Sequence, residues 1–341
     1  MDTVRNRLIK IEGIPADRRL IEELFAAGTL SPKARDFALD YLYPAKNWGL
    51  WVSRMLLALG VTLMLSGIVY FYAFNWNAIP DMVKLGSIEF AMVACMAGAL
   101  VRGLDRLSGK FFALATATLI GVFLAVFGQV YQTGADAWEL FAAWALLIVP
   151  FGVAARFAPV WGLWLVVANI GLTSYWDQWH PISHQLDALL LPFLGGFNAL
   201  VLIVRELLEK HLPWLSARWT RNLPAVISLT CATLPCTWLA LDWHSASDEV
   251  RWSAAAGAVI ISGFYAVYRL VKPDVQTLAA TVLATCIIAE CVLCELLDVT
   301  GRAGADMYLL LGVLTVGIFA GAIVWLRTLS KQLEVSPWLN I

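Results

Sequence analysis

Ten long apolar runs, separated by short polar segments, dominate the chain from Met55 onward. Each approaches the roughly 20 mainly apolar residues that a helix needs to cross a membrane. The runs are Met55–Phe74, Met82–Val101, Phe111–Val130, Trp138–Ala155, Pro159–Ser174, Leu186–Val204, Leu223–Leu241, Trp252–Leu270, Val275–Leu297 and Met307–Leu326. The fourth and fifth are short and close together, so one re-entrant hairpin is an alternative for them. The pattern predicts an all-α integral membrane protein with about ten transmembrane helices.

The first 50 residues are amphipathic instead. Ala16–Ala27 has apolar residues at helical spacing and stops at Gly28, a residue type that commonly follows a helix end. Ser31 and Pro32 are typical of the start of a second helix, which Pro44 ends. A helical hairpin this small buries too little surface for a core of its own. We therefore expect a shared apolar side that packs against the membrane surface or a partner, formed by Leu20, Leu24, Phe37 and Tyr41.

Composition agrees with a membrane protein. Hydrophobic residues make up 60% of the chain and charged residues 14%, against about 45–50% and 25% in soluble proteins. The excess apolar surface predicts the lipid bilayer as its surroundings. With 24 basic and 25 acidic residues, the chain lacks the basic excess of nucleic-acid-binding proteins, so no nucleic-acid partner is predicted.

The basic residues are concentrated in alternate loops of the predicted topology. With the N-terminus inside, 21 of the 24 Lys and Arg fall in inner segments, and only Lys84, Arg251 and Arg302 fall outside. Cytoplasmic loops carry such an excess, so both termini are predicted to be cytoplasmic. The predicted organisation is a cytoplasmic hairpin (1–50), a transmembrane bundle (51–330) and a cytoplasmic tail (331–341). Ten spans can divide into five plus five, which gives the halves opposite orientations, as in inverted-repeat transporters.

Three glutamates lie within the apolar runs. Glu89, Glu290 and Glu295 are all placed in the outer part of the bilayer by this topology. Ionisable residues there usually face protein or water and often mark ion or substrate paths. The alternative is that Glu295 reaches the membrane surface and the other two hydrogen-bond between helices.

A polar turn joins the third and fourth runs at the same outer level. It contains Gln129, Tyr131, Gln132 and Asp136 beside a Gly-Ala pair. An unsatisfied polar group in lipid costs several kcal/mol, so Gln129 needs a protein partner or water. We predict that this turn and the three glutamates line one acidic, outward-facing cavity for a substrate or ion. The alternative is a turn with local helix caps only.

No metal, other cofactor or catalytic residue is predicted. All six cysteines lie in apolar runs, where cysteine behaves as a small hydrophobe. Cys291 and Cys294 form a CxxC, but the chain has no second one and the same span has no histidine. His180, His184 and His244 lie in outer loops without a clear ligand spacing. The chain also shows no nucleophile–base set, P-loop or dinucleotide fingerprint.

Two stretches resemble a bacterial family of predicted membrane proteins called domain of unknown function 2157. They are RRLIEELFAAGTLSPKARDFALDYL in the hairpin and FGQVYQTGADAWELFAAWALLIVP after the third run. The segment FGQVYQTGAD is the most specific part, whereas AAGTLSP departs from the shorter Gly–aliphatic–Ser turn of the family. The resemblance covers about the first half of the chain. It implies a bacterial inner-membrane protein and brings no established activity.

Three functions fit these observations. The first is a transporter or flippase-like carrier that uses the outward-facing cavity. The second is a non-enzymatic subunit or scaffold of a cell-envelope complex, whose hairpin docks a membrane-protein partner. The third and weakest is an envelope-modifying membrane enzyme. A polar cavity across the core would favour the first, a solid core with an apolar exposed hairpin the second, and a closed pocket pairing two carboxyls the third.

The predicted topology is testable by labelling single cysteines in intact cells with a membrane-impermeant maleimide. Cysteines at Thr133, Ser183, Ser247 and Gly304 should react, and those at Lys46, Arg106, Ser216 and Lys331 should react only after lysis. Protection of Thr133 in intact cells would contradict the orientation set by the basic residues.

Overall fold

The computed structural model describes residues 18–42, 48–179, 188–297 and 305–335. The chain divides into two compact units, Met1–Pro80 and Asp81–Ile341, which are described separately. All regular elements in the described ranges are helical, as predicted, and none is a strand.

The first unit contains the predicted hairpin. Its helices are α2 (Arg18–Ala26) and α3 (Pro32–Leu42). Gly28 sits between them with a φ of +71°, a left-handed conformation that favours glycine. Ser31 Oγ accepts from the Ala34 amide at 3.2 Å, as expected of an N-cap. A long apolar helix, α4 (Trp48–Phe74), follows and contains the first predicted span.

One arginine joins the two helices of the hairpin. Arg35 on α3 donates to both carboxylate oxygens of Glu22 on α2, at 2.6 and 2.9 Å. Its guanidinium carbon also lies 5.0 Å from the centre of the Phe25 ring. By contrast, Phe37 and Tyr41 stack on each other and remain 73% and 77% exposed. The hairpin is therefore closed by Arg35, and the described residues do not bury the expected apolar side.

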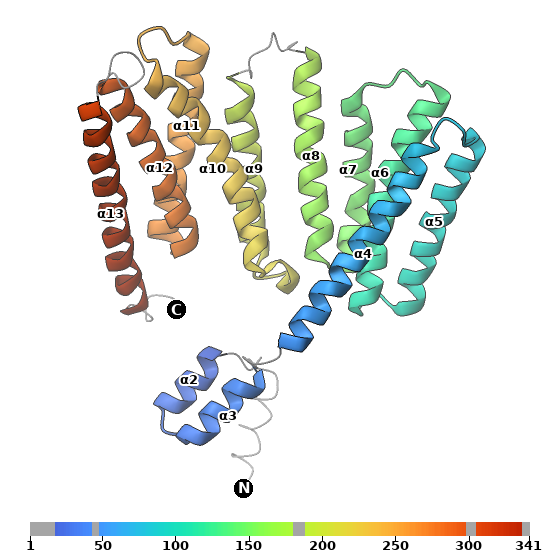
Figure 1. Ribbon diagram of the computed structural model, residues 1–341, viewed down its shortest axis with the longest axis horizontal. Coiled ribbons are helices and arrows are strands. Elements are labelled where there is room, and N and C mark those ends of the chain that lie inside the picture. The colour runs from blue at the N-terminus through green and yellow to red at the C-terminus, as the bar shows by residue number, and fades with distance from the viewer. Residues whose placement is uncertain (1–17, 43–47, 180–187, 298–304, 336–341) are drawn as a thin grey trace. The chain divides into compact units, whose positions relative to one another are not determined.

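The second unit is a series of antiparallel helices. They are α5 (Asp81–Arg102), α6 (Leu107–Tyr131), α7 (Ala137–Ala155), α8 (Ala158–Trp179), α9 (Leu190–Leu208), α10 (Arg218–Leu241), α11 (Asp248–Ala266), α12 (Val275–Leu296) and α13 (Ala305–Val335). Short turns of 3-10 helix, η1 (Pro213–Leu215), and π-helix, η2 (Val267–Val271), precede α10 and follow α11. In Figure 1 the helices follow one another across the view, and α10 packs against α9, α11 and α12.

The prediction of ten spans is confirmed by length and composition. The described residues contain ten helices long and apolar enough to cross a membrane, namely α4 to α13, with η2 extending α11. The fourth and fifth spans, α7 and α8, have 19 and 22 residues, so each is long enough to cross by itself. The chain is a multi-pass membrane protein.

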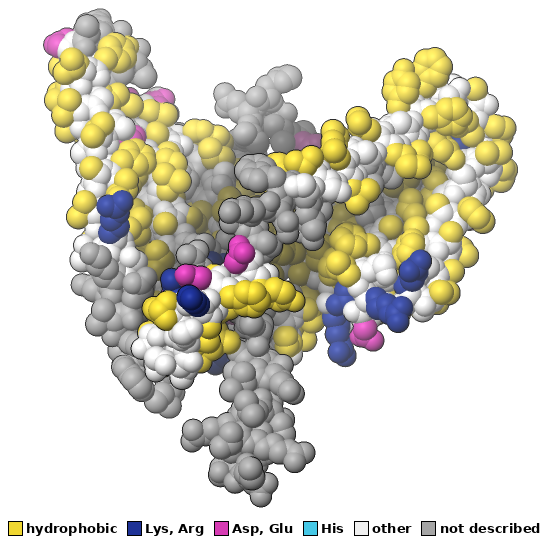
Figure 2. All heavy atoms as spheres, turned by 60° about the horizontal axis from the view of Figure 1, so that its bottom comes forward, with side chains coloured by type: hydrophobic (Ala, Val, Ile, Leu, Met, Phe, Trp, Pro, Cys, Tyr) yellow, Lys and Arg dark blue, Asp and Glu magenta, His cyan; other side chains and the backbone are white. Residues whose placement is uncertain are grey.

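The two ends of the second unit differ in charge. We call the end with Arg102, Arg156, Arg221 and Arg327 the basic end, and the end with Asp81, Asp136, Asp242 and Asp306 the acidic end. In Figure 1 the basic end is at the bottom. Figure 2 brings that end forward and shows hydrophobic side chains along the flanks of the helices. This distribution is expected of a protein whose flanks face lipid.

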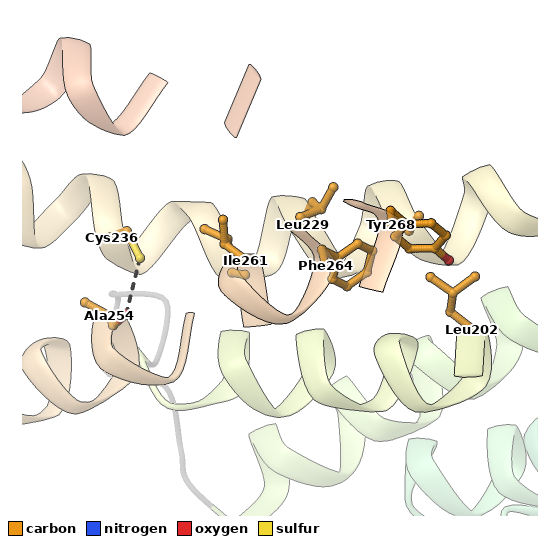
Figure 3. Close-up of a cluster of buried hydrophobic side chains, with 9 residues drawn as sticks. Leu202, Leu229, Cys236, Ala254, Ile261, Phe264 and Tyr268 are labelled. Atoms are coloured by element: carbon orange, nitrogen blue, oxygen red, sulfur yellow. Dashed lines mark hydrogen bonds between the residues drawn. The ribbon is translucent and has the colours of Figure 1, made fainter. Parts of the chain in front are cut away.

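Besides a small cluster of Ala99, Ala113 and Ala155 on α5, α6 and α7, two larger hydrophobic clusters form the interior of the unit. One contains Ala117, Ile148, Val160 and Val167, from α6, α7 and α8. The other, shown in Figure 3, joins α9, α10 and α11 with the η2 turn. In this second cluster α10 and α11 approach closely at Gly257. A Cβ atom at this position would lie 2.3 Å from the Ala232 carbonyl oxygen. A larger residue than glycine would force these two helices apart.

A pair of asparagines links the two clusters across the seam between α8 and α9. Asn198 Nδ2 donates to Asn169 Oδ1 at 2.7 Å, and Asn169 Nδ2 donates back at 3.3 Å. Each Nδ2 also donates to a carbonyl of its own helix, at Leu165 and Leu194. Asn198 is fully buried, so this pair satisfies two amides that hydrocarbon could not.

Replacing one asparagine should destabilise the protein more than replacing both. Asn198→Leu leaves the Asn169 amide without its partner and should lower the free energy of unfolding by about 1–2 kcal/mol. The double variant Asn169→Leu/Asn198→Leu should recover much of this loss. Thermal unfolding in detergent, followed by tryptophan fluorescence, measures both. Additive losses in the double variant would show that the two amides are not coupled.

Candidate functional site

The predicted site residues lie in separate parts of the second unit. Glu89 is exposed on α5 and Gln129 is exposed near the end of α6, whereas Glu290 and Glu295 belong to α12. In Figure 1, α5 and α6 lie at one end of the row and α12 near the other. Helices α5 and α6 pack on each other and toward α7 and α8, while α12 packs against α10, α11 and α13. This unit therefore does not gather the residues around one cavity.

The polar turn after α6 is organised by local contacts and by one hydrogen bond to α8. Gln132 ends the helix in the left-handed region, with a φ of 44°, and its amide donates to the Gly128 carbonyl. The Asp136 amide donates to Glu139 Oε2 at 3.3 Å, and Asp136 Oδ2 accepts from Gln178 at the end of α8. Tyr131 is exposed, with its ring 4.6 Å from that of Phe127. Local caps therefore account for the backbone contacts of this turn, and the Gln178 side chain joins it to α8, 42 positions along the chain.

Glu290 is held between two helices. Thr315 Oγ1 on α13 donates to Glu290 Oε2 at 2.9 Å. The other oxygen, Oε1, is buried without a hydrogen-bond partner in the described part of the chain. This is the interhelical contact that the sequence left open as an alternative. Within the described residues, no three His, Cys, Asp or Glu side chains converge to hold a metal ion.

Glu295 lines a cavity. This acidic-end cavity, about 470 Å³ in volume, lies between the ends of α10, α11 and α12. Its walls are apolar and its charged lining residues are Arg251 and Glu295. The complete lining is Cys236, Leu239, Ala240, Trp243, Arg251, Ala254, Ala255, Ala258, Ile288, Val292, Glu295 and Leu296. The volume falls within the 300–1,000 Å³ typical of ligand pockets.

A second cavity lies at the basic end between α8, α9 and α10. It has a volume of about 360 Å³ and is mainly aromatic and aliphatic. Its large lining side chains include Trp161, Trp164, Phe197, Trp214 and Trp219, and its polar lining residues are Arg205 and Thr220. Trp161 on α8 stacks on Trp214 in η1, with ring centres 6.0 Å apart. This basic-end cavity therefore suits an apolar group.

A charge cluster lies directly beside the basic-end cavity. It contains three cations and three carboxylates, namely Arg205, Arg221, Lys272, Glu206, Glu209 and Asp274. Arg205 is only 5% exposed. Its guanidinium contacts both glutamates at 3.0 Å and donates to the Leu215 carbonyl at 2.7 Å. The Arg221 guanidinium lies 2.6 Å from a carboxylate oxygen of Glu206 and 3.0 Å from one of Asp274. It therefore links α10 to the start of α12.

The cluster changes the ionisation of the two carboxylates that lie outside the spans. Burial raises the pKa of Glu209, but the Lys272 hydrogen bond and the charges of Arg205, Lys272 and Arg221 outweigh it, so the net pKa is lowered. Burial likewise opposes ionisation of Asp274, and hydrogen bonds from Thr277 together with Arg221 lower its pKa overall. Both groups therefore favour the charged form, and the formal charges of the three cations and three carboxylates cancel. The cluster is therefore a neutral clamp on α9, α10 and α12.

The sequence missed both the cluster and the basic-end cavity for one reason. The predicted spans end at Val204 and begin again at Leu223, which leaves Arg205 and Arg221 in a loop. In the structure, α9 continues to Leu208 and α10 begins at Arg218. The spacing of Arg205 and Glu209, one helical turn apart, was the available signal.

Comparison with known proteins identifies a family for part of the chain. Residues 22–161 match the family described as Predicted membrane protein (DUF2157), which confirms the resemblance over this range. The match includes the Gln129–Asp136 turn and ends within α8, so α9 to α13 lie outside it. Curated proteins and solved structures gave no significant match.

Acid should weaken the clamp in a defined pH range. A carboxylate whose folded pKa is lowered adds stability above its ordinary pKa, and this stability is lost as the pH falls through the folded value. Ordinary values are 4.5 for Glu209 and 3.8 for Asp274. The melting temperature should therefore decrease as the pH drops below about 4.5. Glu209→Gln should cost about 1–3 kcal/mol at pH 7 and flatten the acid limb, whereas exposed Glu249→Gln should do neither.

Proposed function

We propose that the protein is a flippase-like carrier of membrane amphiphiles. The observation that carries this proposal is that one helix, α10, lines two apolar cavities toward opposite ends of the bundle. Trp219 and Pro224 line the basic-end cavity, and Cys236 and Ala240 line the acidic-end cavity. An acyl or prenyl chain suits such walls, because it needs no hydrogen-bond partner.

Charges near each cavity suit the polar head of an amphiphile. Arg251 and Glu295 line the acidic-end cavity, and Arg205 links the basic-end cavity to the charge cluster. A carrier of a small polar solute would instead need polar walls along its path. The cavities described for this unit have apolar walls, which favours an amphiphile over such a solute.

Helix α10 has features of a moving element. Pro224 and Pro235 lie next to the two cavities, and each removes the backbone hydrogen bond to the residue four positions earlier. Between the cavities, Ala232 contacts Gly257 of α11 and Ser228 Oγ donates to the Gly195 carbonyl of α9 at 2.7 Å. These contacts separate the cavities, and bending of α10 at its prolines would alter them.

Orientation follows from the distribution of basic residues. With the basic end in the cytoplasm, the basic-end cavity lies in the inner leaflet and the acidic-end cavity in the outer leaflet. The family resemblance supports a bacterial cytoplasmic (inner) membrane. Both termini are then cytoplasmic, and the hairpin lies on the cytoplasmic side.

Reconstitution tests the carrier function. Purified protein in vesicles with fluorescent lipids should speed the exchange of lipid between leaflets, measured by quenching the outer leaflet with dithionite. Filling either cavity with Leu223→Trp or Ala255→Trp should slow exchange roughly tenfold, which corresponds to about 1.4 kcal/mol. Leu223 lines the basic-end cavity and Ala255 lines the acidic-end cavity.

Two exposed positions serve as matched controls. Val226 on α10 and Val259 on α11 are 53% and 72% exposed and line neither cavity. Val226→Trp and Val259→Trp also introduce an indole ring, but outside both cavities, and should leave the rate unchanged. Equal rates with and without the protein, or equal effects of cavity and control variants, would refute the carrier.

The hairpin supports a second candidate, a scaffold or subunit of a cell-envelope complex. Phe37 and Tyr41 form an exposed aromatic pair on α3, and aromatic side chains are enriched where proteins bind one another. A membrane-protein partner would cover this pair. An absence of lipid exchange, together with loss of the protein's cellular role in Phe37→Ala/Tyr41→Ala, would favour the scaffold over the carrier.

A further inference from the structure

The acidic-end cavity has two opposite charges on its lining. Arg251 comes from the first turn of α11, and Glu295 comes from the last turn of α12. Farther in, Cys236 and Ala254 lie against each other in Figure 3, with Cys236 Sγ donating to the Ala254 carbonyl at 3.3 Å. The cavity therefore has an apolar interior and a charged rim.

The charges on this rim are not neutralised as those of the charge cluster are. All three carboxylates in the cluster at the basic end contact a cation. Among the described residues, neither Arg251 nor Glu295 forms an ion pair, with each other or with a third residue. A ligand that carries one negative and one positive charge could pair with both residues.

We infer that this cavity binds a zwitterionic amphiphile with a phosphoethanolamine-type head; this inference rests on the proposed carrier function. The guanidinium of Arg251 offers paired donors for a phosphate. The carboxylate of Glu295 accepts hydrogen bonds from a primary ammonium, which has three donors. The acyl chains occupy the apolar interior beside Ala255 and Val292.

Charge around the cavity argues against amphiphiles of one sign. An anionic head would place its charge near Glu295 at an end of the bundle that also carries Asp242, Asp248 and Glu249. A purely cationic head would leave Arg251 without a partner. A phosphocholine head matches in net charge, but its quaternary ammonium has no N–H to donate to Glu295.

Photo-crosslinking with defined lipids tests the inference. The full-length protein is reconstituted with phospholipids that carry a diazirine in one acyl chain and a phosphoethanolamine, phosphocholine or phosphoglycerol head. Adducts on peptides containing Ala255 and Val292 are counted by mass spectrometry. We expect phosphoethanolamine lipid to exceed phosphoglycerol lipid roughly tenfold, as one charged hydrogen bond would produce.

Charge variants separate head recognition from chain binding. Glu295→Gln should reduce the phosphoethanolamine adduct to the phosphocholine level and raise the phosphoglycerol adduct. Arg251→Gln should reduce the adducts of all three phosphate-containing lipids. Glu249→Gln, an acid on α11 that does not line the cavity, should leave all ratios unchanged.

The adduct pattern separates head recognition from the carrier function. Equal cavity adducts for the three heads, or unchanged ratios in Glu295→Gln, would overturn the head assignment while leaving the carrier standing. An absence of cavity adducts with every lipid would mean that protein covers the cavity, either another segment of this chain or a second copy. That result would overturn both proposals.

Discussion

The arrangement of this protein depends on one constraint, which is that hydrocarbon provides no partner for a polar group. Buried Asn198 bonds to Asn169 and to its own helix, and buried Arg205 bonds to two carboxylates and a carbonyl. Buried threonines such as Thr281 donate to carbonyls one turn earlier in their own helices. Bonds within one helix leave its neighbours unspecified, whereas those of Asn198 and Arg205 select particular neighbours. These few polar contacts therefore join particular helices within the packed bundle.

Helix α10 is where these constraints meet. It packs against α9, α11 and α12, and its first turns carry Thr220 and Arg221 into the charge cluster. A glycine on α11 permits close contact in its middle, and proline interrupts its hydrogen bonding on both sides. The clamp holds the basic end of α10, while its other end borders a cavity whose charges have no described partner. Closely packed segments and segments that border cavities thus alternate along one helix.

The candidate site shows how far residue chemistry alone can lead. Intramembrane glutamates were expected to share one cavity because each is costly in lipid. They are accommodated separately instead: Glu290 by Thr315, and Glu295 at the rim of a cavity. The same free energy can be recovered by any partner of suitable chemistry. Depth along a helix therefore does not indicate which residues meet.

The sequence alone determined the ten spans, the hairpin and the turn after α6, because each depends on local patterns of apolar residues, caps and glycine. It also singled out Glu295, which lines the acidic-end cavity. Only the tertiary structure decided the asparagine pair, the charge cluster and the two cavities. Asn169 and Asn198 are 29 positions apart, and Arg221 and Asp274 are 53 apart. Such contacts depend on which helices become neighbours, and packing of the whole bundle settles that choice.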